Sequence, residues 1–471
     1  MKIKITLYIL LVFISTRIFS QIRADIMPED KNVYQPVDDP LVQQKLKNWQ
    51  DLKFGLFMHW GTYSQWGIVE SWSLCNEDKD FIKNNRQQAL HPDYDQYKKN
   101  YKNLQRTFNP VGFDPQKWSK AAKDAGMRYV VFTTKHHDGF CMFDTQETDY
   151  KITSQKCPYH INPNADVTKA IFNTFRDEGF MIGSYFSKPD WNSEYFWWPY
   201  FATPDRNANY DPIKYPERWG KFKDFTYNQI KELMTGYGPI DILWLDGGWV
   251  NPSRNNQDID MPKIAAMARK NQPGLIIVDR GQKGLFTNYL TPEQHIPDTP
   301  VPYPWESCIT MGESWSYKPA DNYKPAREII HMLIDIVAKG GNLLLNIGPG
   351  PDGDFDPVIY DRLNEIGAWM QVNGEAIYNS EPISPYSDNN LRFTKGINGE
   401  MYVAYLIKEA EPIPTELQIK LIDGKTPEVV KILGRKDKPK YTADGNILTI
   451  KLSSGMISHL QNQPAFIIKI H

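Results

Sequence analysis

The sequence predicts an α/β protein, in which a (β/α)8-type (TIM-like) barrel is followed by a C-terminal antiparallel β-sandwich. From about residue 40 to residue 375, short apolar runs alternate with segments of helical period, which is typical of a parallel sheet covered by helices. From about residue 381, short runs separated by Asn, Gly, Asp and Pro replace that pattern. All 14 tryptophans lie at or before Trp369, so the composition changes where the period changes.

The length and the N-terminus predict three segments. A chain of 471 residues suits one large domain and a smaller one, and we expect the barrel at residues 21–378 and the sandwich at 379–471. Residues 1–20 have the form of a secretory signal peptide, with Lys2 and Lys4 before an apolar run that is too short to span a bilayer. The sequence therefore predicts an exported protein, periplasmic or extracellular, without a membrane span.

The composition argues against several classes of partner. A formal net charge of −2 without a Lys/Arg stripe gives no sign of a nucleic-acid partner. Aromatic residues make up 13% of the chain, which suits stacking on sugar faces and also suits any large core. The 4 cysteines lack metal-ligand spacing, and a core of this size needs no cross-links, so we expect mostly free, buried thiols.

The strand and helix signals follow one another in regular order, and their number favours a closed barrel over an open sheet. A helix at 42–52 precedes a first strand at 54–61. Asp114 is a typical N-cap for the next helix, and Gly126 follows its last turn. The further expected strands are 129–135, 181–187, 240–246, 275–280, a short one at or beside Glu306, and 342–348, and the expected helices are 115–125, 168–178, 216–234, 262–270, 324–339 and 358–371.

The last part of the chain has the period of strands. Several of its runs alternate apolar and polar residues, which indicates antiparallel sheets with one face on a core. This part contains no tryptophan and no clustered carboxylates, so we expect it to pack against the barrel rather than to carry chemistry. The expected strands are 400–406, 416–421, 429–433, 447–452 and 465–470.

Polar and aromatic side chains occupy the C-terminal ends of the expected barrel strands. Asp246 is central, because it ends the apolar run 240–246 and precedes two glycines. Barrel active sites are built at these strand ends, although an aspartate in a turn or at a helix N-terminus is the structural alternative. The other residues could likewise be hydrogen-bonded, ion-paired or core residues. They are His59, His136, His137, Tyr185, Trp244 and Arg280.

The same residues bear on metal binding. His136 and His137 are adjacent, so on a regular strand their side chains would point to opposite faces, which argues against a two-histidine metal site. No His-x-His, His-Glu-x-x-His or paired-Cys spacing is present. The sequence therefore predicts no metal and no cofactor. A metal-dependent hydrolase with His59, His136 and Asp246 as ligands is the alternative, which a chelator assay would decide.

Four runs of the chain together resemble a known family. They are Phe54-Gly-Leu-Phe-Met-His59-Trp-Gly61, Lys135-His-His-Asp-Gly-Phe140, Trp244-Leu-Asp246-Gly and Asn346-Ile-Gly-Pro349, and in this order they resemble the α-L-fucosidases of glycoside hydrolase family 29 over residues 40–375. The resemblance implies a retaining exo-hydrolase of α-L-fucosides with Asp246 as nucleophile. The family's Glu-Trp pair is interrupted here as Glu70-Ser71-Trp72. The implied substrate-binding residues are His59, Glu70, Trp72, His136, His137, Tyr185, Trp244, Arg280 and Trp315.

A retaining glycosidase needs a second carboxyl group as acid/base, about 5–5.5 Å from the nucleophile. The nucleophile must stay ionised while the partner can donate a proton. The resemblance implies a glutamate from the stretch after Arg280, where Glu293 lies in an apparent loop and Glu306 lies at a strand. We expect Glu293 to be the acid/base and Glu306 to make a structural or orienting hydrogen bond, with the reverse as the alternative.

The expected partner is a fucosylated oligosaccharide or glycoconjugate. Imidazoles and an arginine can bind sugar hydroxyls, and aromatic rings can bind the sugar methyl and ring face. One alternative is α-L-galactosidase activity on the same scaffold, because the two sugars differ only by a hydroxyl at C6. Another is a degenerate carbohydrate-binding protein, against which the presence of both Asp246 and Glu293 argues.

Overall fold

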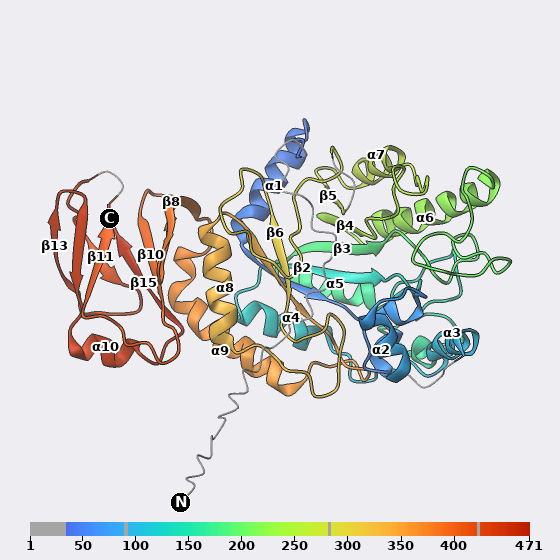
Figure 1. The fold of residues 1–471 in the computed structure, drawn as a ribbon, viewed down its shortest axis with the longest axis horizontal. Coiled ribbons are helices and arrows are strands. Elements are labelled where there is room, and N and C mark those ends of the chain that lie inside the picture. Colours follow the sequence, from blue (N-terminus) through green and yellow to red (C-terminus); the bar gives the residue numbers. More distant parts are fainter. Residues whose placement is uncertain (1–33, 89–92, 281–283, 422–423) are drawn as a thin grey trace, which may run out of the picture.

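The structure is a computed structural model that describes residues 34–88, 93–280, 284–421 and 424–471. The predicted signal peptide, residues 1–20, lies outside the described residues. Figure 1 shows a parallel sheet with its helices on one side of the molecule and antiparallel sheets on the other, with α8 and α9 between them. Among the residues described, no helix is both long and apolar enough to cross a membrane.

The parallel sheet contains seven strands among the described residues, in the order β5-β4-β3-β2-β1-β7-β6. Nearly every strand residue is buried, which is typical of a parallel sheet with both faces covered. Side chains alternate between a core under the helices and a second, aromatic-rich core on the other face. The strands are β1 Phe54–Met58, β2 Tyr129–Lys135, β3 Met181–Ser187, β4 Ile242–Asp246, β5 Ile276–Asp279, β6 Glu306–Thr310 and β7 Asn342–Ile347.

The predicted closed barrel is found only in part, because in the described chain the edge strands β5 and β6 do not pair with each other. An irregular segment, residues 287–294, lies between them. The Asn288 N–H donates to the Ile277 carbonyl (2.9 Å), and the Glu306 N–H donates to the Leu290 carbonyl (2.8 Å). Pro292 has no N–H for a regular ladder. The segment therefore bridges the gap without forming a strand, and it brings Glu293 beside β6 through a bridge to Cys308.

The helices lie where the sequence predicts them, with bounds shifted by a few residues. Asp39 and Asp114 cap α1 and α4, since each carboxylate accepts backbone N–H groups of the first turn and a proline follows each cap. Among the helices of this part, α2 and α3 were not predicted, because their sequences are mostly polar. The helices are α1 Pro40–Leu52, α2 Asp80–Gln88, α3 Tyr94–Asn103, α4 Pro115–Asp124, α5 Val167–Asp177, α6 Pro216–Gly236, α7 Met261–Asn271, α8 Ala326–Ala338 and α9 Pro357–Asn373.

The C-terminal part consists of two antiparallel sheets that share one apolar core. A five-stranded sheet (β12-β15-β10-β9-β8) faces a three-stranded sheet (β11-β14-β13) across side chains that include Val403, Ile419 and Ile450. Arg327 and His331 of α8 bind carbonyl groups of this part. The strands β8, β9 and β13 and the helix α10 (Ser454–Leu460) were not predicted. The strands are β8 Glu381–Asp388, β9 Leu391–Lys395, β10 Met401–Leu406, β11 Glu416–Lys420, β12 Val430–Ile432, β13 Lys440–Asp444, β14 Ile447–Lys451 and β15 Ala465–Ile470.

Candidate active site

Two carboxylates meet on one arginine at the C-terminal edge of the parallel sheet. Asp246 is the last residue of β4, and Arg280 directly follows β5. The Arg280 guanidinium contacts Asp246 Oδ1 at 3.1 Å through one nitrogen and Glu293 Oε2 at 2.5 Å through the other. The side chains of Asp246 and Glu293 are 16% and 17% exposed, so both are accessible to a ligand that enters from this edge.

The surroundings of Asp246 keep it ionised. Burial alone would raise its pKa, but the charge of Arg280, the neighbouring His137 and the Tyr185 hydroxyl together hold the pKa at about 2. The Tyr185 hydroxyl donates to Asp246 Oδ2 at 2.8 Å, and His137 Nε2 lies 3.8 Å from the same oxygen. Asp246 is therefore a carboxylate throughout the physiological pH range, as a nucleophile must be.

Three histidines lie beside Asp246, and each has a polar partner at Nδ1. The partners are Asn346 Oδ1 for His59 (2.7 Å), Ser71 Oγ for His136 (2.6 Å) and Ser187 Oγ for His137 (2.7 Å). Burial is the main cause that lowers the pKa of His59 to about 4, the pKa of His137 to about 3, and that of His136 well below its usual value. The imidazoles are neutral at pH 7 and suit hydrogen bonds with uncharged hydroxyls.

The expectation that His136 and His137 point to opposite faces is wrong. Their ring centroids are 4.1 Å apart, and both rings contact other residues of the site. The reason is that β2 ends at Lys135, so the two histidines lie in a loop where strand alternation does not apply. One ligand atom each from His136, His137 and Asp246 lies within 4.8 Å of the others. However, Arg280 already places a cation on Asp246, and a metal ion there would be repelled by it.

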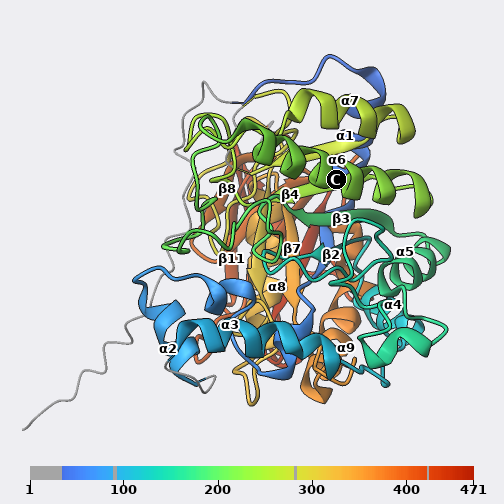
Figure 2. The same ribbon diagram turned by 90° about the vertical axis from the view of Figure 1, so that its right-hand side faces the viewer.

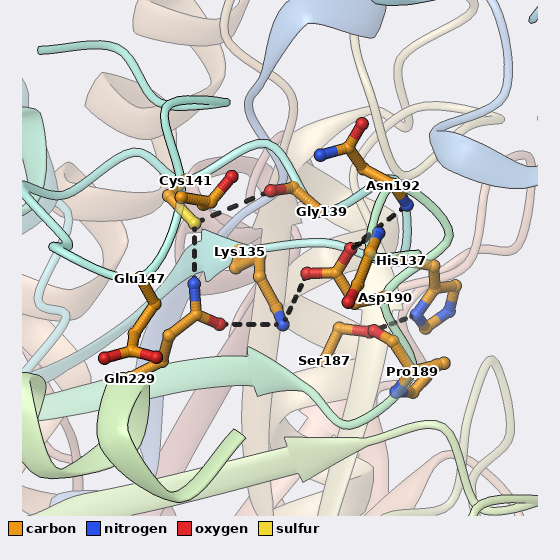
Figure 3. Close-up of polar contacts among 12 residues, drawn as sticks. Lys135, His137, Gly139, Cys141, Glu147, Ser187, Pro189, Asp190, Asn192 and Gln229 are labelled. Carbon is orange, nitrogen blue, oxygen red and sulfur yellow. Dashed lines mark hydrogen bonds and ion pairs between the residues drawn. The ribbon is translucent and has the colours of Figure 1, made fainter. Parts of the chain in front are cut away.

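The other members of the Lys-His-His-Asp-Gly-Phe run hold this loop in place. Lys135 Nζ is fully buried and binds Asp190 Oδ2 and Gln229 Oε1, both at 3.1 Å (Figure 3). The Asp138 carboxylate accepts the Tyr101 hydroxyl at 2.8 Å. Gly139 has φ +80°, and a Cβ there would lie 2.2 Å from Asp190 Oδ1, so only glycine fits. The loops after β2 and β3 are thereby fastened to each other.

Aromatic rings line the site beneath and beside the histidines. The Tyr185 ring stacks on Trp244 with centroids 5.3 Å apart, and Trp315 lies 5.1 Å from His59. Phe57 contacts both His59 (4.5 Å) and Trp315 (6.0 Å) and was not predicted as a site residue. Its position two residues before His59 could have indicated it, because residues i and i+2 of a strand share a face.

Glu70, Ser71 and Trp72 all contribute to the site despite the departure from the family's pattern. Glu70 is buried, and burial raises its pKa to about 8 although it accepts the Ser316 N–H at 3.1 Å. The inserted Ser71 provides the hydroxyl that binds His136 Nδ1. The Trp72 ring lies 5.3 Å from the His137 ring in an edge-to-face contact. Ser71, Ser187 and Asn346 were not predicted as histidine partners, although Asn346 opens one of the four runs that carry the resemblance.

Glu306 lies away from this edge. It is the first residue of β6, whereas Asp246 is the last residue of β4, and the strands are parallel, so the two carboxyl groups belong to opposite ends of the sheet. Glu306 is fully buried and accepts the Tyr129 hydroxyl at 2.7 Å and the Trp244 indole N–H at 3.4 Å. Burial raises its pKa to about 7. This geometry supports Glu293 rather than Glu306 as the partner of Asp246.

An ionised carboxylate at a strand end, a loop carboxyl on the same arginine, and a lining of neutral imidazoles and aromatic rings define a glycoside hydrolase. The comparisons agree with this class. The family model described as Alpha-L-fucosidase matches residues 22–375. The chain belongs to the α-L-fucosidase family.

Relatives and solved structures of this family resemble most of the chain. An α-L-fucosidase of Branchiostoma floridae is 25% identical over 456 residues, which are 93% of this chain and 95% of the relative. The α-L-fucosidase isoenzyme 1 of Paenibacillus thiaminolyticus is 28% identical with a TM-score of 0.74 and covers 91% of this chain and 99% of its own. The Thermotoga maritima α-fucosidase, solved with a mechanism-based inhibitor, is 25% identical with a TM-score of 0.72, over 93% and 99% of the two chains.

Proposed function

We propose that this protein is an exo-acting, retaining α-L-fucosidase, which removes terminal α-L-fucosyl residues from glycans through a covalent glycosyl-enzyme intermediate. The observation that carries the proposal is the Arg280 guanidinium that binds Asp246 and Glu293 together. Membership of the α-L-fucosidase family supplies the substrate class.

The two carboxyl groups have different roles in this reaction. Asp246 attacks the anomeric carbon, and protonated Glu293 gives its proton to the leaving oxygen, so a fucosyl ester on Asp246 replaces the glycosidic bond. Glu293, now a carboxylate, takes a proton from the water that cleaves the ester and is thereby restored. The Arg280 guanidinium contacts both carboxyl groups and so holds them on one cation.

The lining of the site fits a 6-deoxy sugar. The Nε2 atoms of the neutral histidines provide hydrogen-bonding groups for ring hydroxyls, while Phe57 and Trp315 provide an apolar surface for the methyl group. The C6 hydroxyl of an α-L-galactoside would lose its water against this apolar surface without gaining a partner. We therefore expect the fucoside to be the better substrate.

One screen tests the proposal. The purified protein is assayed on aryl α-L-fucoside, aryl α-L-galactoside and fucosylated oligosaccharides, with the configuration of the first-formed sugar read by NMR. The expected result is a preference for fucosides, release of α-L-fucose, and activity that EDTA leaves unchanged. An inverted first product, a preference for the galactoside, or activity that EDTA abolishes and Zn²⁺ or Mn²⁺ restores would contradict it.

We also propose that the protein is exported. The support is the sequence of residues 1–20, with its lysines before a short apolar run. N-terminal sequencing of the protein from its native cells tests this, since removal of the leader is expected and an intact N-terminus would contradict it.

A further inference from the structure

Arg206, in the long loop between β3 and α6, is held by three separate parts of the chain. Its carbonyl accepts indole N–H groups from both Trp191 and Trp249, each at 3.1 Å. Its guanidinium binds Glu77 in a bidentate pair, with Nε to Oε1 at 2.5 Å and the second contact at 2.7 Å. Although burial opposes ionisation, this pairing holds the pKa of Glu77 below its usual range. A side chain fixed in this way has little rotational entropy left to lose on binding a ligand.

Arg206 lies next to the fucose site. The carbon of its guanidinium is 4.6 Å from the Trp72 ring centroid and 5.0 Å from that of Trp249. These two rings lie 5.3 and 5.1 Å from His137, whose Nε2 is 3.8 Å from Asp246. The side chain of His137 is 2% exposed and that of Arg206 is 23% exposed. From His137 to Arg206 the cluster therefore extends toward solvent.

The chemistry of this cluster fits an uncharged sugar. The rings of Trp72 and Trp249 provide apolar contact area, and the Arg206–Glu77 pair places donors and acceptors side by side, as neighbouring sugar hydroxyls do. The two charges of the pair cancel, so a charged group would gain attraction to one member and repulsion from the other. A neutral pyranose ring meets no such repulsion.

We propose that Arg206 and Glu77, with the edges of Trp72 and Trp249, form the subsite for the neutral sugar to which the fucosyl residue is attached. This inference rests on the proposed function. In an exo-acting enzyme the fucosyl residue occupies the closed end of the site, and the rest of the glycan extends toward solvent. The cluster lies on that side of His137, and it would recognise the leaving sugar during cleavage and an acceptor sugar during transfer.

The test compares Arg206→Ala with the wild type on two substrates. Fucosyl-lactose carries a sugar that would occupy the subsite, whereas α-L-fucosyl fluoride does not. We expect kcat/KM to fall about 10- to 100-fold on fucosyl-lactose, the effect of a lost hydrogen bond to a charged group. On the fluoride we expect a change of less than about 3-fold. Glu77→Gln is expected to show the same selectivity.

A transfer assay gives a second readout. With fucosyl fluoride as donor and lactose added, the ester bond on Asp246 breaks, a glycosidic bond to a lactose hydroxyl forms, and the proton of that hydroxyl goes to Glu293. Arg206→Ala is expected to lower the ratio of transfer to hydrolysis at equal consumption of the fluoride. Loss of an ordinary structural contact would not change this ratio.

Arg218→Ala is a matched control, because Arg218 also lies over a tryptophan, 4.0 Å from the Trp198 ring, but outside the cluster. This variant is expected to change neither the ratio of the kcat/KM values on the two substrates nor the ratio of transfer to hydrolysis. Equal losses on both substrates in Arg206→Ala, or an unchanged transfer ratio, would overturn the subsite. A wild-type protein that consumes neither substrate would instead overturn the proposed function, so the two failures are distinguishable.

Discussion

A carboxyl group lies at each end of the parallel sheet, Asp246 partly buried and Glu306 fully buried, and their surroundings give the two groups opposite properties. Asp246, at the C-terminal end of β4, has a pKa of about 2, whereas Glu306, at the N-terminal end of β6, has a pKa of about 7. Burial raises the pKa of both. Only Asp246 has a cation beside it, Arg280 at 3.1 Å, while the partners of Glu306 are the neutral Tyr129 and Trp244.

The difference shows that partners, rather than burial, decide what a buried carboxyl group can do. A carboxylate beside a guanidinium keeps its charge and can attack an electrophilic carbon. A buried carboxyl group that only receives hydrogen bonds from neutral groups favours its protonated, uncharged form.

Figure 2 shows the molecule from the side to which β3 points, with α6 and α7 at the top of the view and α2 and α3 at the bottom. The catalytic edge lies among the loops that these helices flank.

Asp246→Ala is the strongest test of the comparison between the carboxyl groups at the two ends of the sheet. Because the covalent intermediate cannot form, we expect turnover of aryl α-L-fucoside to fall by at least ~10⁴-fold. Azide should partly restore the activity, and it should give a fucosyl azide of inverted configuration, since it attacks from the side that Asp246 vacates. Thermal unfolding of the variant controls for misfolding. Turnover close to that of the wild type would show that Asp246 is not the nucleophile.

Glu293→Ala is the next largest perturbation. General acid catalysis contributes about 10²–10⁴-fold, so hydrolysis of fucosylated glycans should fall by that factor. An aryl fucoside with a good leaving group needs little protonation, and its first step should be nearly unchanged. Azide should speed its turnover and give a product of retained configuration, because it attacks the fucosyl ester from the opposite face.

The matched variant is Glu306→Ala, at the other end of the sheet. If Glu293→Ala kept its full activity on glycans while Glu306→Ala showed the leaving-group dependence and the azide rescue, the acid/base role would belong to Glu306.

Tyr185→Phe should have an intermediate effect. It removes the hydrogen bond to Asp246 Oδ2, and bonds of this kind to charged groups contribute about 1.5–3 kcal/mol, so kcat/KM should fall about 10- to 100-fold. The hydroxyl helps to lower the pKa of Asp246, and its loss should therefore move the acid limb of the pH profile upward. A loss of activity without this upward shift would mean that Tyr185 acts only by packing.

Much of the sheet and its catalytic edge could be predicted from the sequence. The strands at 129–135 and 181–187 have the predicted bounds, because a glycine that ends the preceding helix, Gly126 or Gly179, lies shortly before each. Asp246 and Arg280 were placed by the strands that precede them. The four thiols were predicted to be mostly free and buried, and in the described chain all four are. Local sequence patterns are sufficient to predict the position of a site residue when that residue lies at the end of a strand.

The remaining features depend on contacts between distant segments. Ser71 and Asn346 bind histidines that lie 65 and 287 residues away in the chain, which no local pattern indicates. The close pair of His136 and His137 was missed because strand alternation was applied to two residues that follow the predicted end of β2 at Lys135. The bridging segment at 287–294 lacks the apolar run of a strand, and its place is fixed only by its neighbours β5 and β6.

The smallest expected effect concerns Glu306→Gln. The catalytic edge keeps its groups in this variant, so kcat/KM should change by less than about 3-fold. The substitution should instead change the stability of the protein in a pH-dependent way, because the carboxyl group of Glu306 titrates beside Tyr129 and Trp244 and the amide of glutamine does not. The quantity to measure is the difference in Tm between wild type and variant from pH 4 to pH 8.

The sign of this difference follows from the pKa of Glu306, which is about 7 in the folded protein against 4.5 for an ordinary glutamate. Below pH 4.5 Glu306 is protonated in both the folded and the unfolded chain, and the Tm of the wild type exceeds that of the variant by its largest amount. Between pH 4.5 and 7 Glu306 loses its proton in the unfolded chain but keeps it in the folded chain, so the difference in Tm falls. Above pH 7 the difference in Tm stays constant. Glu70 and Asp138, whose pKa values are also raised, occur in both proteins and cancel in the difference. A difference in Tm that grows with pH would mean that Glu306 is ionised in the folded protein, and the two ends of the sheet would then hold carboxylates of the same kind.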